Sequence, residues 1–141
     1  MPRAVVTTRE VEIAAGARAV WDVVAAPAAH PRLDPRVRLV ESNGADGTAG
    51  SSYVVAVGST RLRYMITDAV PGDRLVADVF RGERRVAEQR GELTASERGV
   101  VLAWTVTQWA PWPLRGLMAR VCRKALPRWL AAVEREATGA F

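Results

Sequence analysis

His30 is the only histidine of this chain and the only side chain that ordinarily titrates near neutral pH, so it is the first candidate for chemistry. Near neutral pH the His30 imidazole could act as general acid and general base. Because His30 is the only histidine, a Ser-His-Asp or Cys-His arrangement would have to use it, and a multi-histidine metal site is excluded. Cys122 is the only cysteine, which excludes a cysteine-based metal site. Asp34 could orient the imidazole, but it is better explained as a turn residue. The alternative is that His30 lies in a surface loop and takes no part in chemistry.

Two further side chains could polarise a carbonyl group. Arg9 alternates with Val11 and Ile13, which places its guanidinium on the apolar face of a strand. If buried, it needs a partner and could anchor a carboxylate or stabilise an enolate; at the open end of the strand it would reach water instead. Tyr64 is the third candidate catalytic residue, and its hydroxyl could donate to a ligand or remain in water while the ring packs.

The composition is that of a globular protein with a basic charge. The 141 residues are 49% hydrophobic and 25% charged, with a formal net charge of +5 and a pI of about 10.6. The basic residues, of which only Lys124 is a lysine, are spread along the chain, which argues against nucleic-acid binding. No stretch approaches the roughly 20 apolar residues of a membrane span, and no signal peptide is apparent, so we expect a cytoplasmic location.

The elements that must position these residues follow a simple order, and we predict one domain over residues 1–141. A strand over 4–14 precedes a helix over 17–25 and a second short helix over 28–33, before Pro31 and Pro35 force an extended chain. Turn signals such as Pro71-Gly72-Asp73 then separate six more strands of an antiparallel meander. These strands cover 37–43, 51–58, 61–70, 74–81, 84–95 and 100–109.

A long amphipathic helix over 112–137 closes the chain. Its apolar residues recur at helical spacing and predict a buried stripe of Leu114, Leu117, Met118, Val121, Ala125, Leu126, Trp129, Leu130 and Val133. Pro111 and Pro113 suit the start of the helix, and Pro127 should kink it. A helix laid across a bent sheet encloses volume that side chains need not fill, so the layout predicts an α+β fold with a pocket.

Several short patterns carry a resemblance that covers the whole chain. They are Ile13-Ala-Ala-Gly-Ala-Arg-Ala-Val-Trp-Asp22, His30-Pro-Arg-Leu-Asp-Pro35 and the later hairpin segments 71–76, 91–94 and 97–100. Together they resemble the START/Bet v 1-like (SRPBCC) superfamily, and within it the bacterial polyketide cyclase/dehydrase and lipid-transport group. Where many members have an aromatic residue before the Asp-Pro pair, this chain has Leu33.

The resemblance implies a helix-grip fold, in which a curved seven-stranded antiparallel sheet wraps around a long C-terminal helix. Two short helices would lie between the first and second strands. The resemblance also implies a hydrophobic cavity between helix and sheet, with His30 at its entrance and a mouth reshaped by Leu33. Members of the superfamily variously cyclise or dehydrate polyketides, carry lipids or quinones, or bind molecules similar to plant hormones.

Strand parity predicts which side chains line this cavity, because alternate residues of a strand share one face. The more apolar faces belong to Leu62, Tyr64 and Ile66, to Leu102, Trp104 and Gln108, and to Gln89 with Ala87, Gly91 and Leu93. Tyr64 and Gln89 would supply hydrogen bonds to a polar group of an apolar ligand. The candidate ligand-binding residues are Leu62, Tyr64, Ile66, Gln89, Leu102, Trp104, Gln108 and Met118.

Two functions from different classes fit these expectations. The first is a cyclase/dehydratase that folds a hydrophobic, polyoxygenated substrate and promotes an aldol-type cyclisation or dehydration through His30, Arg9 and Tyr64, with no metal or organic cofactor. The second is a non-catalytic carrier of a lipid, quinone or similar apolar ligand. Peripheral membrane contact through Trp109, Trp112 and Trp129 is a weaker expectation than packing of these rings, and the protein would be a monomer or homodimer.

Overall fold

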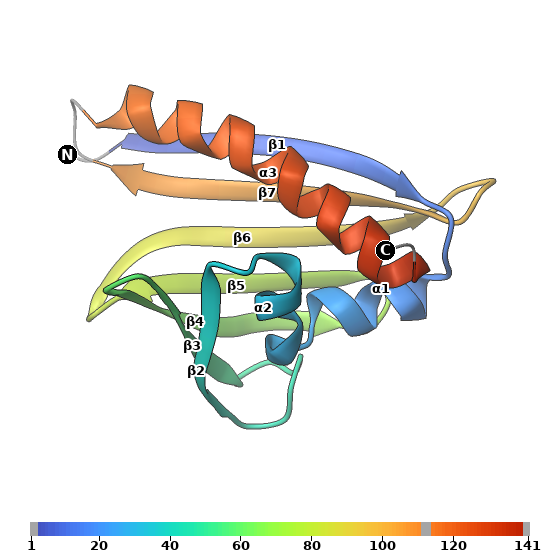
Figure 1. The fold of residues 1–141 in the computed structure, drawn as a ribbon, viewed down its shortest axis with the longest axis horizontal. Coiled ribbons are helices and arrows are strands. Elements are labelled where there is room, and N and C mark those ends of the chain that lie inside the picture. The colour runs from blue at the N-terminus through green and yellow to red at the C-terminus, as the bar shows by residue number, and fades with distance from the viewer. Residues whose placement is uncertain (1–2, 111–113, 140–141) are drawn as a thin grey trace.

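The computed structural model describes residues 3–110 and 114–139 of the chain. The described residues form seven strands, a single 3₁₀ turn and three helices, in the predicted order (Figure 1). The elements are β1 (Arg3–Ile13), α1 (Ala17–Val24), η1 (Pro27–Ala29), α2 (His30–Leu33), β2 (Val37–Asn43), β3 (Ser52–Val57), β4 (Thr60–Val70), β5 (Arg74–Arg81), β6 (Arg84–Ala95), β7 (Val100–Ala110) and α3 (Arg115–Thr138).

The strands form one antiparallel sheet in the order β1-β7-β6-β5-β4-β3-β2. Six consecutive strands are a meander, and β1 pairs with the last strand, so that Arg9 lies opposite Trp104 and Val11 opposite Leu102. The sheet is strongly twisted: β2 runs at a steep angle to β1 and β7 (Figure 1). The register shifts in three strand pairs (β2–β3, β4–β5 and β5–β6), where the extra residue of a bulge bends the strand. The α+β helix-grip prediction is confirmed.

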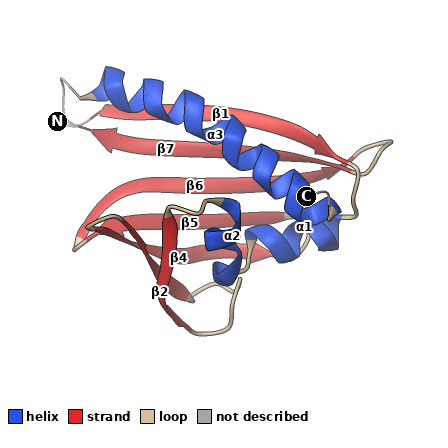
Figure 2. Cartoon of the chain, viewed as in Figure 1, coloured by secondary structure: helices blue, strands red, loops and turns tan. Residues whose placement is uncertain are grey.

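All three helices lie on one side of the sheet, and α3 crosses that side diagonally (Figure 2). The apolar side chains of α1, including Val20 and Trp21, are buried as predicted. The short second helix is also present, but Pro31 does not extend the chain there: it stands in the first turn of α2, where the missing N–H costs no hydrogen bond. None of the described helices is both long enough and apolar enough to span a bilayer.

The predicted apolar stripe of the last helix is buried along only half of its length. Leu130 and Val133 are 2% and 0% exposed, whereas Leu117 and Val121 are 58% and 57% exposed. The C-terminal half of α3 packs into the core together with α1. The N-terminal half runs over β1 (Figure 1), but its residues Leu117 and Val121 lie off the buried side of the helix. Pro111, Trp112 and Pro113, which the prediction placed at the start of this helix, lie outside the described residues.

Backbone geometry confirms the predicted turn at Pro71-Gly72-Asp73 and shows a close contact that the sequence did not predict. Gly72 has φ +76°, and the Asp73 N–H donates to the Val70 carbonyl over 2.9 Å, as a type II turn requires. Gly91 lies directly opposite Trp104 in the β6–β7 pair, and the indole covers the bare backbone there. A Cβ atom added at Gly91 would overlap the six-membered ring of Trp104. The position of Trp104 therefore depends on a glycine at residue 91.

We predict that Gly91→Ala lowers the free energy of unfolding by about 1–3 kcal/mol, because the new methyl group forces the Trp104 ring out of place. Urea unfolding measures this change. The matched control is Gly116→Ala on α3, where an added Cβ meets nothing within 4 Å and should raise helix stability by up to about 1 kcal/mol. Equal effects of the two substitutions would contradict the steric explanation.

Candidate functional site

An open cavity of about 690 Å³ lies between α3 and the inner face of the sheet. This volume falls within the range of small-molecule sites, roughly 300–1,000 Å³. Nine of the 21 lining residues are aliphatic and come from α2, α3 and four strands: Leu33, Val37, Val55, Val57, Leu62, Val106, Val121, Ala125 and Leu126. The hollow predicted from the layout is therefore present.

A second, much smaller space of about 10 Å³ adjoins the cavity. The two share five lining residues, namely His30, Tyr64, Gln89, Trp104 and Trp129. Its volume is about that needed to hold one water molecule. Four of its ten lining residues are His30, Tyr53, Tyr64 and Gln89, so uncharged polar side chains converge on this inner compartment.

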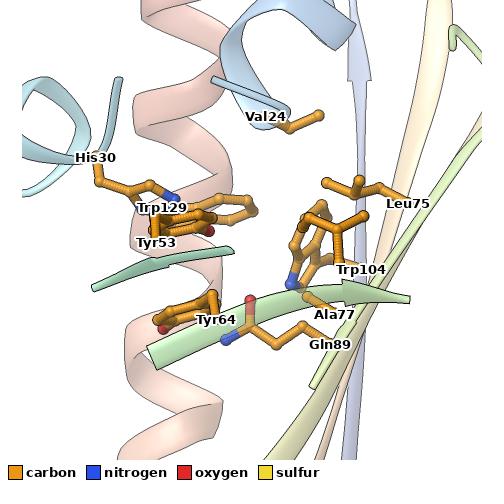
Figure 3. A pocket seen from close by; sticks show the side chains of 10 residues that line it. Val24, His30, Tyr53, Tyr64, Leu75, Ala77, Gln89, Trp104 and Trp129 are labelled. Atoms are coloured by element: carbon orange, nitrogen blue, oxygen red, sulfur yellow. Dashed lines mark hydrogen bonds between the residues drawn. The ribbon is translucent and has the colours of Figure 1, made fainter. Parts of the chain in front are cut away.

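His30, Tyr53, Tyr64 and Gln89 form what we call the inner polar cluster (Figure 3). Tyr53 and Tyr64 are direct partners in the β3–β4 ladder, and their rings stack with centroids 5.0 Å apart and planes 3° from parallel. His30 reaches them from α2: its Nε2 atom lies 2.8 Å from the Tyr53 hydroxyl, and its ring centroid lies 5.8 Å from that of Tyr64. Gln89 joins from β6.

Burial keeps the ionisable members of the inner polar cluster neutral. Desolvation lowers the pKa of His30 from 6.5 to about 4, so the imidazole is uncharged at neutral pH. Desolvation also raises the pKa of Tyr53 well above its ordinary value, and the neighbouring Tyr64 adds to this rise. Burial raises the pKa of Tyr64 as well, while a hydrogen bond from Gln89 opposes the shift. The inner polar cluster therefore carries no charge of its own.

Two tryptophans form the wall between the two spaces. Trp104 and Trp129 meet at a centroid distance of 4.5 Å and an interplanar angle of 54°, which is a favourable tilted arrangement of aromatic rings. Trp109 lies on the opposite face of β7, where the Arg85 guanidinium sits 4.3 Å above its ring. Of the three tryptophans considered for membrane contact, Trp109 and Trp129 are thus packed against other side chains. The third, Trp112, lies outside the described residues.

Most residues selected by strand parity do line the site. Tyr64, Gln89 and Trp104 border both spaces, Leu62 and Gln108 border the large cavity, and Ile66 borders the inner compartment. The Oε1 atom of Gln108 is buried and has no hydrogen-bond partner among the described residues.

Leu102 and Met118 are placed differently from their predictions. Leu102 is only 1% exposed and belongs to the core, and it borders neither space. Met118 is partly buried in the N-terminal half of α3, and it also borders neither space.

Arg9 is not in the site. It does share the inner face of β1 with Val11 and Ile13, but it is exposed, and its Nη1 atom donates to the Thr8 carbonyl over 2.7 Å. It borders neither the cavity nor the inner compartment. Strand parity gave the correct face, yet β1 is an edge strand and this part of it is not covered well enough to bury a guanidinium.

The surface-loop explanation for His30 is wrong, because the imidazole borders both spaces. Asp34 does not orient this ring: its carboxylate accepts two hydrogen bonds, of 3.1 and 3.0 Å, from the Arg36 guanidinium. These bonds hold the pKa of Asp34 below its ordinary value. The residue that contacts His30 is Tyr53, which sequence reasoning missed. Its alternation with Val55 along β3 was the available signal, but the contact to His30 depends on how α2 folds back.

The donor set of the site does not suggest a metal centre. Within residues 3–110 and 114–139, no three histidine, cysteine, aspartate or glutamate side chains come together in a way that could hold a metal ion. Cys122 is buried at the cavity wall as a free thiol.

Comparison with known proteins identifies the family. The model of the family described as polyketide cyclase / dehydrase and lipid transport matches residues 4–138, nearly the whole chain. This chain belongs to that family. Among curated proteins no match was found.

Solved structures with low sequence identity share the fold over nearly the full chain. A protein from Mesorhizobium loti, MLL2253, is 12% identical with a TM-score of 0.76, and 99% of each chain is covered. The Aha1 dimer from Colwellia psychrerythraea is 14% identical with a TM-score of 0.74, covering 97% of this chain and 99% of that one. Norcoclaurine synthase from Thalictrum flavum, solved with dopamine and hydroxybenzaldehyde, is 16% identical with a TM-score of 0.73, covering 99% and 90%. These likenesses show that the chain shares its fold with the three proteins.

The pKa of His30 makes stability depend on pH. Between pH 6.5 and about 4, the unfolded chain protonates this histidine while the folded protein does not, so stability falls as the pH falls through this window. We predict that His30→Gln, which keeps a hydrogen-bonding side chain but does not titrate, removes up to about 3 kcal/mol of this dependence. Urea unfolding of both proteins across the window measures the difference, and parallel profiles would contradict the burial of His30.

Proposed function

We propose that this protein binds a hydrophobic, oxygen-bearing small molecule in the cavity and promotes its aldol-type cyclisation or dehydration. The observation that carries the proposal is the neutral polar cluster at the inner end of an apolar cavity. Three candidate side chains, His30, Tyr64 and Gln89, border the same space, which favours chemistry over simple storage. Family membership supports ligand binding, and the reaction is our inference.

The chemistry assigns separate roles to the members of the cluster. The neutral imidazole of His30 takes a proton from the carbon next to a ligand carbonyl, and the Tyr64 hydroxyl donates a hydrogen bond to the enolate oxygen that forms. The enolate carbon attacks a second carbonyl of the same chain, and the resulting alkoxide recovers the proton from His30. In a dehydration, the protonated imidazole instead gives its proton to the departing hydroxyl, which leaves as water.

The low pKa of His30 is compatible with this role. Desolvation disfavours an isolated imidazolium, but in the proposed step the positive ring forms beside a negative enolate. The pair of opposite charges offsets the desolvation cost in a way that the empty cavity does not. Tyr53, which contacts His30 Nε2 over 2.8 Å, would hold the ring in position during the transfer.

The second candidate is a carrier that holds an apolar ligand without changing it. The mainly apolar lining of the large cavity favours it, because the inner polar cluster is a small part of the available surface. Carrier and enzyme share the requirement for binding and differ only in turnover. Two experiments therefore test the proposal in sequence.

Binding is tested with the neutral fluorescent probe N-phenylnaphthylamine. We predict that Leu62→Trp, which fills part of the cavity, weakens probe binding by at least about tenfold through steric exclusion. The control is Arg61→Trp, which adds the same ring to the exposed opposite face of β4 and should leave probe affinity unchanged. If both variants bind like the unmodified protein, the cavity is not the binding site.

Turnover is tested with a linear poly-β-ketone thioester, following the cyclised aromatic product by absorbance and mass spectrometry. We predict that His30→Gln lowers the rate by about a hundredfold or more while changing probe affinity by less than about threefold. Arg18→Gln, on the exposed face of α1, serves as the control for a surface charge change. Probe binding without any turnover by the unmodified protein would favour the carrier, and full turnover by His30→Gln would exclude the proposed base.

A further inference from the structure

The mouth of the large cavity is unusually basic for an apolar site. Arg36, Lys124, Arg128 and Arg135 border it, whereas Asp34 is the only acidic residue that does so. Asp34 is already engaged by Arg36 in the bidentate pair described above, so these two charges offset each other. The three cations that remain all belong to α3.

Lys124, Arg128 and Arg135 lie on one face of α3. Their spacing of four and seven residues brings them within about 40° of each other around the helix axis. All three are exposed, and none forms an ion pair with another side chain of the described residues. Long basic side chains of this kind place their stems along an apolar surface and their charges in water. We call these three residues the cationic stripe.

Other basic residues of the same helix do not border the cavity. Arg120 and Arg123 are also exposed and belong to α3, but they lie outside the lining of both spaces. The positive charge of α3 is therefore divided into one group at the cavity mouth and another directed elsewhere. This division allows Lys124 and Arg128 at the cavity to be compared with Arg120 and Arg123, which lie on the same helix but away from the cavity.

We propose that the cationic stripe binds the anionic head, a carboxylate or phosphate, of an amphipathic ligand whose apolar body occupies the cavity. The proposal rests on the function proposed above, since it requires a hydrophobic ligand in that cavity. Charge-assisted hydrogen bonds from lysine and arginine to such a head are stronger than neutral ones and add to the burial of the apolar body. A head fixed at the mouth directs the far end of the molecule towards the inner polar cluster.

The experiment compares decanoate, decyl phosphate and decanol, each displacing N-phenylnaphthylamine from the folded, full-length protein below the concentrations at which the amphiphiles form micelles. The three ligands have the same apolar chain and differ in the head. We expect both anions to bind about tenfold more tightly than decanol, with a preference that weakens as salt is added. The double variant K124Q/R128Q should lose most of that preference while its affinity for decanol changes by less than about twofold. The control R120Q/R123Q removes the same charge from the same helix and should retain the preference.

The outcomes separate this inference from the proposed function. If decanol binds as tightly as the two anions, or if both double variants lose the preference equally, the cationic stripe does not bind an anionic head and the inference is overturned while cavity binding stands. If neither the probe nor decanol binds, both proposals fail. If K124Q/R128Q loses affinity only for vesicles of anionic lipid and not for monomeric decanoate, the stripe is a membrane-contact surface and the inference is also overturned.

Discussion

The packing of the C-terminal half of α3 against α1 and the sheet is the constraint on which the rest of the structure depends. Leu126, Leu130 and Val133 are buried there and fix the helix across the concave side. In the other half of α3, Leu117 and Val121 remain exposed, and Val121 borders the cavity between the helix and the sheet. The contacts that fix α3 across the sheet therefore also position one wall of the cavity. An ion pair of 2.6 Å between Arg32 and Glu136 joins α2 to the same end of α3.

The inner polar cluster shows how polar groups can be buried in such a cavity at modest cost. A buried charge would need a partner, but His30, Tyr53 and Tyr64 are all neutral under ordinary conditions, and two of them form a hydrogen bond with each other. The inner polar cluster thus offers hydrogen-bonding groups to a ligand without a permanent charge. This arrangement is compatible with the enolate of the proposed reaction and also with an uncharged apolar ligand.

Much of the fold and part of the site could be predicted from the sequence, and the failures have physical reasons. Alternation along single strands correctly placed Tyr64, Gln89 and Trp104, because a strand's parity depends only on local geometry. Parity does not determine whether another element covers a given position. It therefore gave the correct face for Arg9 but did not reveal that this position on an edge strand is exposed and outside the site. Periodicity likewise identified the apolar residues of α3 but not which of them border the cavity, which is why Met118 was misplaced.

Contacts between distant segments were beyond the reach of local patterns. The hydrogen bond from Tyr53 to His30 joins residues 23 positions apart and requires η1 and α2 to fold back over β3. The separation of the basic residues of α3 into two groups is also invisible until the helix has a fixed rotation over the sheet. Reasoning from the sequence thus identified which strands form the site more reliably than which side chains meet in it.

The bare backbone at Gly91 has a consequence for how this cavity could diversify among proteins of the same fold. Because the indole of Trp104 occupies the volume that a side chain at position 91 would take, the sizes of these two residues are inversely linked. A larger residue at 91 is tolerated only with a smaller ring or an aliphatic group at 104, and the exchange would deepen the hollow beside Trp129. Ligand size could therefore be retuned by a two-residue swap that leaves every helix and strand in place.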